Sequence, residues 1–324
     1  MPVLSRVLIS PAFQNFVRSI SNVAVIGSGQ MGSGIAALCG AYGYKVKLFD
    51  CDDDQLEKSV EKINKILHRL RRHKSKDFVE STLSKIELTK DINDAVSDSD
   101  LVIESITEDL KAKRRLFHTL EGLAPQSCLF TTNTSSISVN EITETFSQKE
   151  SFCGLHFFNP VDVMKLVEII RCHFTSDEAL KVRNVSIFIL GCLLNPQHLM
   201  PFAESLNKTV VQCKDTPGFI VNRLLIPYLL EAVEMFERGE ASLESIDLAM
   251  RAGAGHPMGP FELADHVGLD IIVAALEYWT LSYPDERVFR LNQTLRQLVA
   301  DGKLGKKVGC GFFIYDENGH VVKK

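Results

Sequence analysis

The 324-residue sequence lacks several features that would each define a class of protein. It has no Cys-x-x-Cys pair, so its eight cysteines predict reduced, buried thiols rather than a disulfide framework or a metal centre. Its longest apolar run, IFILGCLL over residues 187–194, is far shorter than the roughly 20 residues of a transmembrane helix. Internal repeats and low-complexity tracts are also absent. We therefore expect a globular protein with no membrane span and no bound metal.

Acidic residues are missing from the start of the chain, where the first is Asp50, although the whole chain has a net charge of −5. That net charge gives no general attraction to nucleic acid. Residues 1–21 contain Arg6, Arg18, several serines and apolar residues that can share a helical face. This composition is typical of a mitochondrial targeting segment and predicts a location in the mitochondrial matrix. A plain disordered extension is the alternative.

Strand and helix patterns alternate over residues 22–214. Short apolar runs predict strands over residues 23–26, 45–49, 86–89, 101–104, 129–131, 152–157, 167–171 and 209–211. A helix with a single apolar stripe is expected over residues 55–72. This alternation predicts an α/β first domain of the Rossmann type, with a doubly wound, mainly parallel sheet.

Strand patterns disappear after Asp215, which predicts an all-α second domain over residues 215–324. A helix is expected to start at Thr216-Pro217-Gly218 and to stop at Gly239. Ser242 should cap a second helix that ends at Gly253. Further helices are expected over residues 269–278 and 286–300.

A glycine motif, Gly27-Ser28-Gly29-Gln30-Met31-Gly32, follows the first predicted strand and opens a predicted helix. G-x-G-x-x-G alone is a weak signal, but this context and Asp50 at the end of the next strand match the dinucleotide-binding pattern. The cofactor-binding candidates are Gly27, Gly29, Gln30, Met31, Gly32 and Asp50. The acidic run after Asp50 should repel a 2′-phosphate, which favours NAD over NADP. FAD shares the motif, and a turn that binds nothing is the structural alternative.

Two ionisable residues lie on neighbouring predicted strands. His156 ends one strand, and Glu168 lies inside the apolar strand that follows. A buried acid is costly unless it is paired, and a carboxylate that fixes one imidazole nitrogen makes the other a better base. The pair could therefore take a proton from an alcohol as hydride leaves. A structural histidine and a solvent-facing Glu168 are the alternatives.

The segment Thr131–Ser136, written TTNTSS, follows another predicted strand and is rich in hydroxyl and amide groups. Loops at the ends of parallel strands bind ligands in open α/β sheets. A turn that caps the next helix is the alternative.

The chain resembles the short-chain L-3-hydroxyacyl-CoA dehydrogenases of fatty-acid β-oxidation from about residue 22 to residue 315. The stretches that carry the resemblance are GSGQMGSGIA, NTSSIS, GLHFFNPVDVMKLVEII, CKDTPGFIVNRLL, GAGHPMGPFELADHVGLD and GKKVGCGFF. The resemblance implies NAD-dependent oxidation of a 3-hydroxyacyl-CoA to a 3-oxoacyl-CoA. It also implies that the helical domain covers the substrate and forms a homodimer. A dehydrogenase of another hydroxy acid, or a non-catalytic NAD-binding relative, is the alternative.

The same resemblance implies a role for individual residues. His156 is similar to the family's catalytic base and Glu168 to its carboxylate partner, while Ser135 and Asn222 resemble the groups that hold the substrate oxygen. Asn159 resembles the position beside the nicotinamide. Further NAD contacts are implied for Glu108, Lys113, Ser135 and Lys307.

The sequence departs from the family pattern at two places. Ile66 stands where the family has a serine that contacts CoA, and His73 aligns near its CoA-binding lysine. His73 and Lys74 belong to a basic cluster that could meet CoA phosphates or could form a solvated helix face. An apolar insertion at about residues 183–199 interrupts a helix that Thr175 and Glu178 should start. It could be a packed hairpin, a partner-binding patch or an artefact of how the coding sequence was assembled.

Overall fold

The computed structural model describes residues 20–71, 75, 77–175 and 199–322. The chain divides into two compact units after Asp215, whereas the sequence predicts the boundary one residue earlier. The targeting segment up to residue 19, residues 72–74, and the apolar insertion up to residue 198 lie outside the described residues. So does the helix start expected at Glu178.

An eight-stranded sheet forms the centre of the first unit, in the order β3-β2-β1-β4-β5-β6-β7-β8. Every neighbouring pair is parallel except β6 with β7. The strands are β1 Asn22–Ile26, β2 Lys45–Phe49, β3 Ile86–Thr89, β4 Leu101–Glu104, β5 Leu129–Thr132, β6 Phe152–Phe157, β7 Leu166–Arg171 and β8 Thr209–Lys214. The predicted Rossmann-type, mainly parallel sheet is confirmed.

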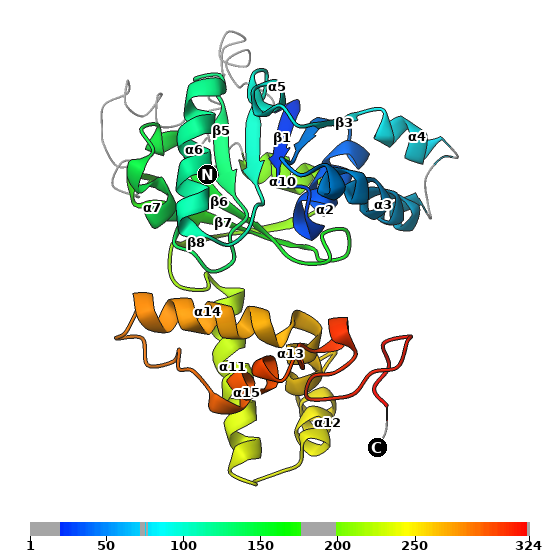
Figure 1. Cartoon of the computed structure of the whole chain (residues 1–324), viewed down its shortest axis with the longest axis vertical. Coiled ribbons are helices and arrows are strands. Elements are labelled where there is room, and N and C mark those ends of the chain that lie inside the picture. Colours follow the sequence, from blue (N-terminus) through cyan, green and yellow to red (C-terminus); the bar gives the residue numbers. More distant parts are fainter. Residues whose placement is uncertain (1–19, 72–74, 76, 176–198, 323–324) are drawn as a thin grey trace, which may run out of the picture. The chain divides into compact units, whose positions relative to one another are not determined.

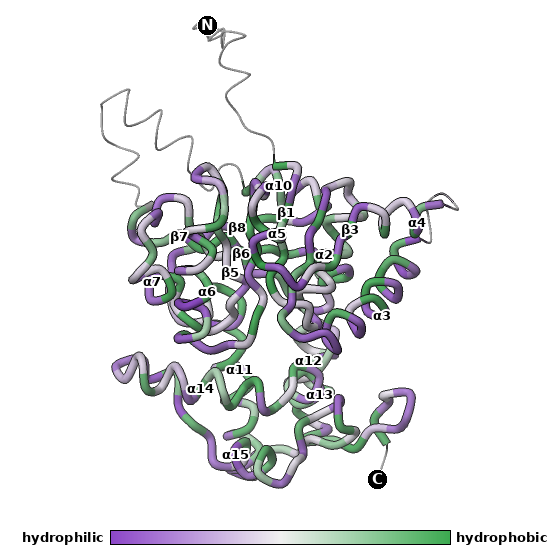
Figure 2. The backbone as a smooth tube through the Cα atoms, turned by 45° about the horizontal axis from the view of Figure 1, so that its top comes forward, coloured by the Kyte–Doolittle hydropathy of each residue, from purple (hydrophilic) through white to green (hydrophobic). Residues whose placement is uncertain are grey.

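Helices cover both faces of this sheet (Figure 1). They are α2 Gln30–Ala41, α3 Asp53–Leu70, α4 Phe78–Leu83, α5 Ile92–Val96, α6 Leu110–Leu123, α7 Val139–Ile142 and α10 Leu199–Ser205. The tube of α3 alternates between hydrophobic and hydrophilic residues along its length (Figure 2). Such a period places one apolar stripe against α2 and leaves the charged side in water.

Alternate residues of each strand pack on opposite faces, as the two-residue period of a strand requires. On one face, Leu155 of β6 and Val167 of β7 join a core formed with α2, α3 and α10. On the other face, edge-to-face contacts connect the aromatic rings of α6, β5 and β6 and of the loop before β6; these rings are Phe117, Phe130, Phe146 and Phe152. His156 and Glu168 follow Leu155 and Val167, so both point to the second face.

The second unit is helical among its described residues. Its helices are α11 Val221–Glu237, α12 Leu243–Ala254, α13 Pro260–Val267, α14 Leu269–Ser282 and α15 Gln293–Ala300. Trp279, 1% exposed, lies in their common core. Helix α12 does not end at Gly253 as predicted, because Gly255 adopts the left-handed conformation (φ 71°) that closes the helix. Helix α15 starts later than predicted, where Asn292 caps the N–H of Leu295.

Candidate active site

The glycine motif forms a tight turn between β1 and α2, at the carboxyl end of the parallel strands. Gly27 has φ 103°, and a Cβ there would lie 2.5 Å from the carbonyl oxygen of Ser105. A Cβ on Gly32 would lie 1.8 Å from the carbonyl oxygen of Gly27. A Cβ on Gly29, by contrast, would meet no atom within 4 Å. Two glycines therefore close the turn, and the third leaves open space at the N-terminus of α2, whose free N–H groups suit a pyrophosphate.

Asp50, directly after β2, supports this turn from the side. Its Oδ2 accepts hydrogen bonds from the backbone N (2.8 Å) and the Oγ (2.9 Å) of Ser28. Two of the acids that follow have structural partners, because Asp52 caps α3 and Asp53 pairs with Lys90 at 2.6 Å. Asp50 is half-buried beside the turn, which fits the ribose-binding role expected for it.

His156 and Glu168 lie directly opposite each other in the antiparallel pair β6–β7. The Nδ1 of His156 and the Oε2 of Glu168 are 2.8 Å apart. Glu168 is 0% exposed and His156 is 4% exposed. The ring of Phe158 lies against the imidazole, with 4.4 Å between ring centroids. The strand pairing therefore holds a carboxylate on one ring nitrogen, as a base–orienter pair requires.

Asn133 fastens the start of the loop after β5 to two neighbouring strands. The backbone N of Asn133 donates to the carbonyl oxygen of Glu104, and its Oδ1 accepts from the backbone N of Phe157, each at 2.8 Å. Glu108 then binds the middle of the loop, because its Oε1 accepts from the backbone N of Ser135 and of Ser136, each at 3.1 Å. The loop that carries Ser135 is therefore tied to the strand that carries His156.

Glu108 and Lys113, both expected to contact NAD, form a charged network within the first unit. The Nζ of Lys113 lies 2.6 Å from Glu104 Oε1 and 3.2 Å from Glu108 Oε2. Lys113 is 1% exposed. Burial acts to lower the pKa of Lys113, but the charges of the two glutamates raise it above its usual value. Desolvation opposes ionisation of Glu108, although its side chain is 36% exposed, yet the charge of Lys113 and hydrogen bonds from Thr134 and Ser136 lower the pKa of Glu108.

Asn159 is exposed at the turn that joins β6 to β7, in a cis peptide bond with Pro160. Lys208 clamps the rest of this turn, because its Nζ donates to the carbonyl oxygens of Val161 and Met164. Burial, together with the charge of Lys165, lowers the pKa of Lys208 to about 8. The buried ammonium group of Lys208 therefore holds the turn beside His156 in place.

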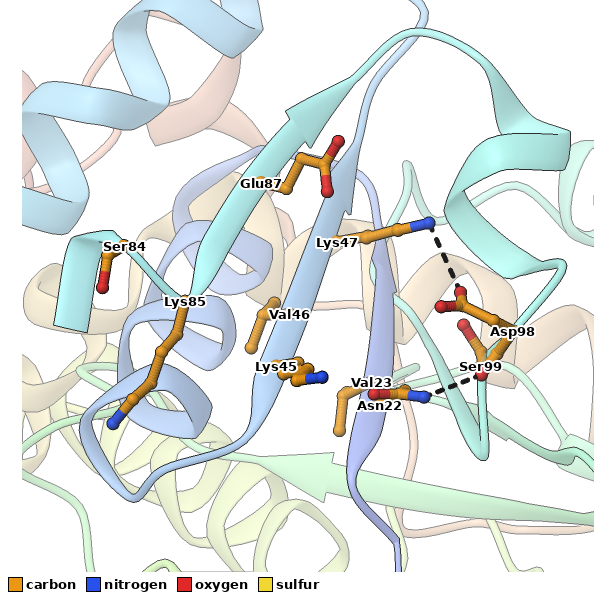
Figure 3. Close-up of a pocket in the computed structure, with 10 residues that line it drawn as sticks. All are labelled: Asn22, Val23, Lys45, Val46, Lys47, Ser84, Lys85, Glu87, Asp98 and Ser99. Carbon is orange, nitrogen blue, oxygen red and sulfur yellow. Dashed lines mark hydrogen bonds and ion pairs between the residues drawn. The ribbon is translucent and has the colours of Figure 1, made fainter. Parts of the chain in front are cut away.

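The structure also has a pocket away from the glycine turn. A pocket of about 310 Å³ lies at the amino ends of β1 and β2, the opposite end of β1 from the glycine turn (Figure 3). Its Lys47 is already paired with Asp94 at 3.1 Å and Asp98 at 3.3 Å.

Among the described residues, His, Cys, Asp and Glu form no group that could hold a metal ion. None of the described helices has the length and apolar character needed to cross a bilayer.

Comparisons with known proteins place this geometry in a family. Residues 22–187 match the NAD binding domain of 3-hydroxyacyl-CoA dehydrogenase, and residues 218–315 match the C-terminal domain of the same enzyme. The chain is 43% identical to a probable 3-hydroxyacyl-CoA dehydrogenase of Caenorhabditis elegans, over 92% of this chain and 97% of that protein. The chain belongs to the 3-hydroxyacyl-CoA dehydrogenase family.

Other members of the 3-hydroxyacyl-CoA dehydrogenase family agree with this assignment. The mitochondrial hydroxyacyl-coenzyme A dehydrogenase of Homo sapiens is 43% identical over 91% of each chain. A crystal structure of (S)-3-hydroxybutyryl-CoA dehydrogenase from Ralstonia eutropha matches with a TM-score of 0.80 and 34% identity, covering 92% of this chain and 100% of that chain. The predicted family, enzyme class and NAD cofactor are confirmed.

The departure of the sequence at Ile66 has a structural explanation. Ile66 is 3% exposed and packs in the core that α3 forms with α2. Its side chain is therefore turned away from solvent and does not offer a contact for CoA. Nearby, the guanidinium of Arg69 makes two hydrogen bonds to Asp162, at 2.8 and 2.9 Å. The substrate-binding candidates His73 and Lys74 lie outside the described residues.

Two further candidates belong to the second unit. Asn222 is the second residue of α11. The Nζ of Lys307 lies 2.6 Å from both carboxylate oxygens of Asp270. The expected roles of Asn222 with the substrate and of Lys307 with NAD remain predictions.

Sequence reasoning did not single out Glu104, the last residue of β4. Glu104 is 0% exposed, and it accepts hydrogen bonds from Lys113, Ile106 and Thr132. An acid that ends an apolar strand beside the glycine turn was the available signal. Its lysine partner could not be recognised, because Lys113 lies among four other basic residues of α6, Lys111, Arg114, Arg115 and His118.

Proposed function

We propose that this protein oxidises the 3-hydroxyl group of an L-3-hydroxyacyl-CoA to a ketone, with His156 as the general base and NAD as the hydride acceptor. The hydrogen bond between His156 and the fully buried Glu168 carries the proposal. A carboxylate in this position accepts the Nδ1 proton of the imidazole. The Nε2 lone pair is then available to take the proton of the substrate alcohol.

The protein contributes orientation and charge to this reaction, and NAD when bound supplies the redox chemistry. Ser135 and Asn222 are proposed to hold the substrate oxygen, and Asn159 to lie beside the nicotinamide. Glu168 keeps one tautomer of His156 in place and stabilises the imidazolium that forms. A general base of this kind contributes a factor of about 10² to 10⁴ in rate.

The test is the appearance of NADH absorbance with 3-hydroxybutyryl-CoA, with a longer 3-hydroxyacyl-CoA and with a sugar acid. Wild type should oxidise the acyl-CoA substrates, and His156→Gln should lose that activity. Activity on the sugar acid alone would favour a dehydrogenase of a different hydroxy acid. Equal rates in wild type and His156→Gln would remove His156 from the mechanism.

We further propose a homodimer formed through the helical unit and a location in the mitochondrial matrix, where fatty-acid β-oxidation would supply the substrate. Large apolar side chains of this unit support the first proposal, because they are more than half exposed: Leu224 70%, Leu248 58%, Ile271 52% and Leu281 83%. Light scattering that gives the mass of one 36.2 kDa chain would contradict it.

Relatives named mitochondrial support the proposed location in the mitochondrial matrix. Diffuse cytosolic fluorescence from a reporter fused to residues 1–25 would contradict it.

A further inference from the structure

Glu104 occupies the point of the sheet where the strand order reverses. Its strand, β4, lies between β1 and β5, and Glu104 pairs in register with Ile26 on one side and with Thr132 on the other. The chain leaves β1 and β4 in opposite directions along the sheet, which opens a crevice between their carboxyl ends. Ligands of doubly wound sheets bind in this crevice. A charged side chain buried directly beneath it therefore calls for an explanation.

Burial of a charge is unfavourable unless its partners compensate for the lost water. Glu104 has a full set of partners. Its Oε1 accepts from the Nζ of Lys113 at 2.6 Å and from the backbone N of Ile106 at 2.7 Å, and its Oε2 accepts from the Oγ1 of Thr132 at 2.6 Å. With 0% exposure, Glu104 does not itself contact a ligand.

The partners of Glu104 belong to both walls of the crevice. Ile106 follows Ser105, whose carbonyl oxygen packs so closely on the glycine turn that only a glycine fits at position 27. Thr132 is the last residue of β5, directly before the loop that carries Ser135. Its neighbour Asn133 donates a backbone hydrogen bond to the carbonyl oxygen of Glu104. One side chain thus connects the cofactor turn with the loop expected to bind the substrate.

A second connection runs through Lys113. Its Nζ bridges Glu104 and Glu108, and Glu108 accepts the backbone N–H groups of Ser135 and Ser136. If the charge of Glu104 is lost, Lys113 retains only Glu108 as an ionic partner. The Glu108 carboxylate should then be drawn toward the ammonium group and away from the two amides.

We propose that Glu104 is a positioning residue that sets the place of Ser135 relative to His156, through Thr132 directly and through Lys113 and Glu108. This inference rests on the proposed function for the role of Ser135. The connection to His156 is made by Asn133, which accepts a hydrogen bond from the backbone N of Phe157. A displacement of about 1 Å in such a group can cost a factor of about 10² in rate.

The first experiment compares wild type with Glu104→Gln, an uncharged variant of nearly the same shape. With 3-hydroxybutyryl-CoA and NAD, we expect kcat to fall about 10- to 100-fold and KM for the acyl-CoA to rise. Hydrogen exchange without cofactor or substrate should become faster in the peptide that contains residues 133–137. A purely structural defect would instead lower the folded fraction and leave KM and exchange of the folded protein unchanged.

A matched pair of variants keeps the test decisive if Glu104→Gln does not fold. Thr131 and Thr132 are adjacent in β5, and both are 0% exposed. Thr131 donates to the carbonyl oxygen of Val102, whereas Thr132 donates to Glu104. Valine at either position removes one buried hydrogen bond from the same strand. Only Thr132→Val should speed exchange at residues 133–137 and raise KM, while Thr131→Val should lower only the melting temperature.

The outcomes separate this inference from the proposed function. If wild type reduces NAD with neither 3-hydroxybutyryl-CoA nor a longer 3-hydroxyacyl-CoA, the proposed function fails, and the exchange data alone decide whether Glu104 fixes the loop. If wild type is active but the two threonine variants behave alike, or Glu104→Gln keeps wild-type exchange, kcat and KM, the positioning role is overturned.

Discussion

The two units of this protein use buried carboxylates in opposite ways. In the first unit, Glu104 and Glu168 are 0% exposed, and each faces a side chain that carries or exchanges a proton, Lys113 or His156. In the second unit, Asp247 and Asp265 are 2% and 1% exposed, and within the described part of the chain neither accepts a hydrogen bond from a basic side chain. Burial is the same in the two units, and the partners differ.

The partners of the helical-unit aspartates are mainly backbone amides. Asp247 accepts from the N–H groups of Phe261 and Glu262, in the first turn of α13. It therefore caps a helix to which it does not belong, at a position where α13 itself has only Gly259. A Cβ on Gly259 would lie 2.2 Å from the carboxyl carbon of Asp247, so glycine is required there.

Asp265 fastens the C-terminal segment in the same manner. It accepts from the N–H groups of Phe312 and Phe313, at 2.8 and 2.9 Å, and from the hydroxyl of Tyr315 at 2.9 Å. These partners hold chain segments together and have no proton to exchange near neutral pH. A buried carboxylate therefore indicates a functional site only when its partner can change its own protonation state or can contact a ligand.

The largest effect is expected from Glu168→Gln, which keeps the shape of the side chain and removes its charge. Loss of the carboxylate weakens stabilisation of the imidazolium form of His156, so kcat should fall about 10²- to 10⁴-fold. The measurement is NADH formation with 3-hydroxybutyryl-CoA. Glu87→Gln, on the exposed part of β3, is the control and should retain wild-type kcat. A Glu168→Gln rate close to that of the control would show that the charge of Glu168 does not assist His156.

The next largest effect is expected from Asp265→Ala, in the helical unit. The substitution leaves two backbone N–H groups and a buried hydroxyl without their acceptor, and the free energy of unfolding should fall by about 3 kcal/mol or more. Denaturant unfolding followed by circular dichroism measures the loss. Asp316→Ala removes an acceptor of two backbone N–H groups at the surface of the same segment, so it should cost less than about 1 kcal/mol. Similar losses in both variants would contradict the structural role of burial at Asp265.

The pH dependence of stability provides a finer test. Burial raises the pKa of Asp265 above its usual value, although hydrogen bonds from Phe313, Phe312 and Tyr315 act to lower it. An acid with a raised pKa in the folded state loses its proton first in the unfolded state. The stability it contributes is therefore complete below the unfolded pKa of about 3.9 and decreases as pH rises to the folded pKa.

The measurement that isolates this effect is the difference in unfolding free energy between wild type and Asp265→Asn from pH 4 to pH 7. Wild type should lose stability relative to the variant as pH rises, by at most about 1.4 kcal/mol per pH unit. Glu108 should act in the opposite direction, because its lowered pKa gives stability that is lost as pH falls. A flat difference curve for Asp265→Asn would show that its hydrogen bonds fully offset burial.

The smallest expected effect concerns the thiols. Burial raises the pKa of Cys39 and of Cys153 to about 12, and these cysteines are 0% and 3% exposed. Cys51 is exposed after β2. Iodoacetamide at pH 8 should therefore label Cys51 at least about 100-fold faster than Cys39 or Cys153, as measured by mass spectrometry of peptides. Equal labelling of the three would show that the sheet of the first unit opens more readily than its packing indicates.

The elements with the clearest local patterns were predictable. The strand at residues 101–104 was predicted from a short apolar run, and the helix from residue 55 onward from an apolar stripe of helical period. The glycine turn was predicted from its position between a strand and a helix. The pairing of His156 with Glu168 was predicted, because both lie on predicted strands that follow each other along the chain, β6 and β7. Helix α13 was missed because its N-cap residue, Gly259, has no side chain and Asp247 on another helix supplies the acceptor, although Pro260 at its first position was a local start signal.

The alternation of strands and helices, the glycine turn for a dinucleotide and the residue types needed for proton transfer follow from the sequence, because they depend on neighbours within a few positions. The pairing of Glu104 with Lys113 and the support of Ser28 by Asp50 follow only from the folded chain. Each of these depends on which distant segments the sheet brings together. The role of a buried charged residue depends on the partner that the fold places beside it, and the sequence alone does not identify that partner.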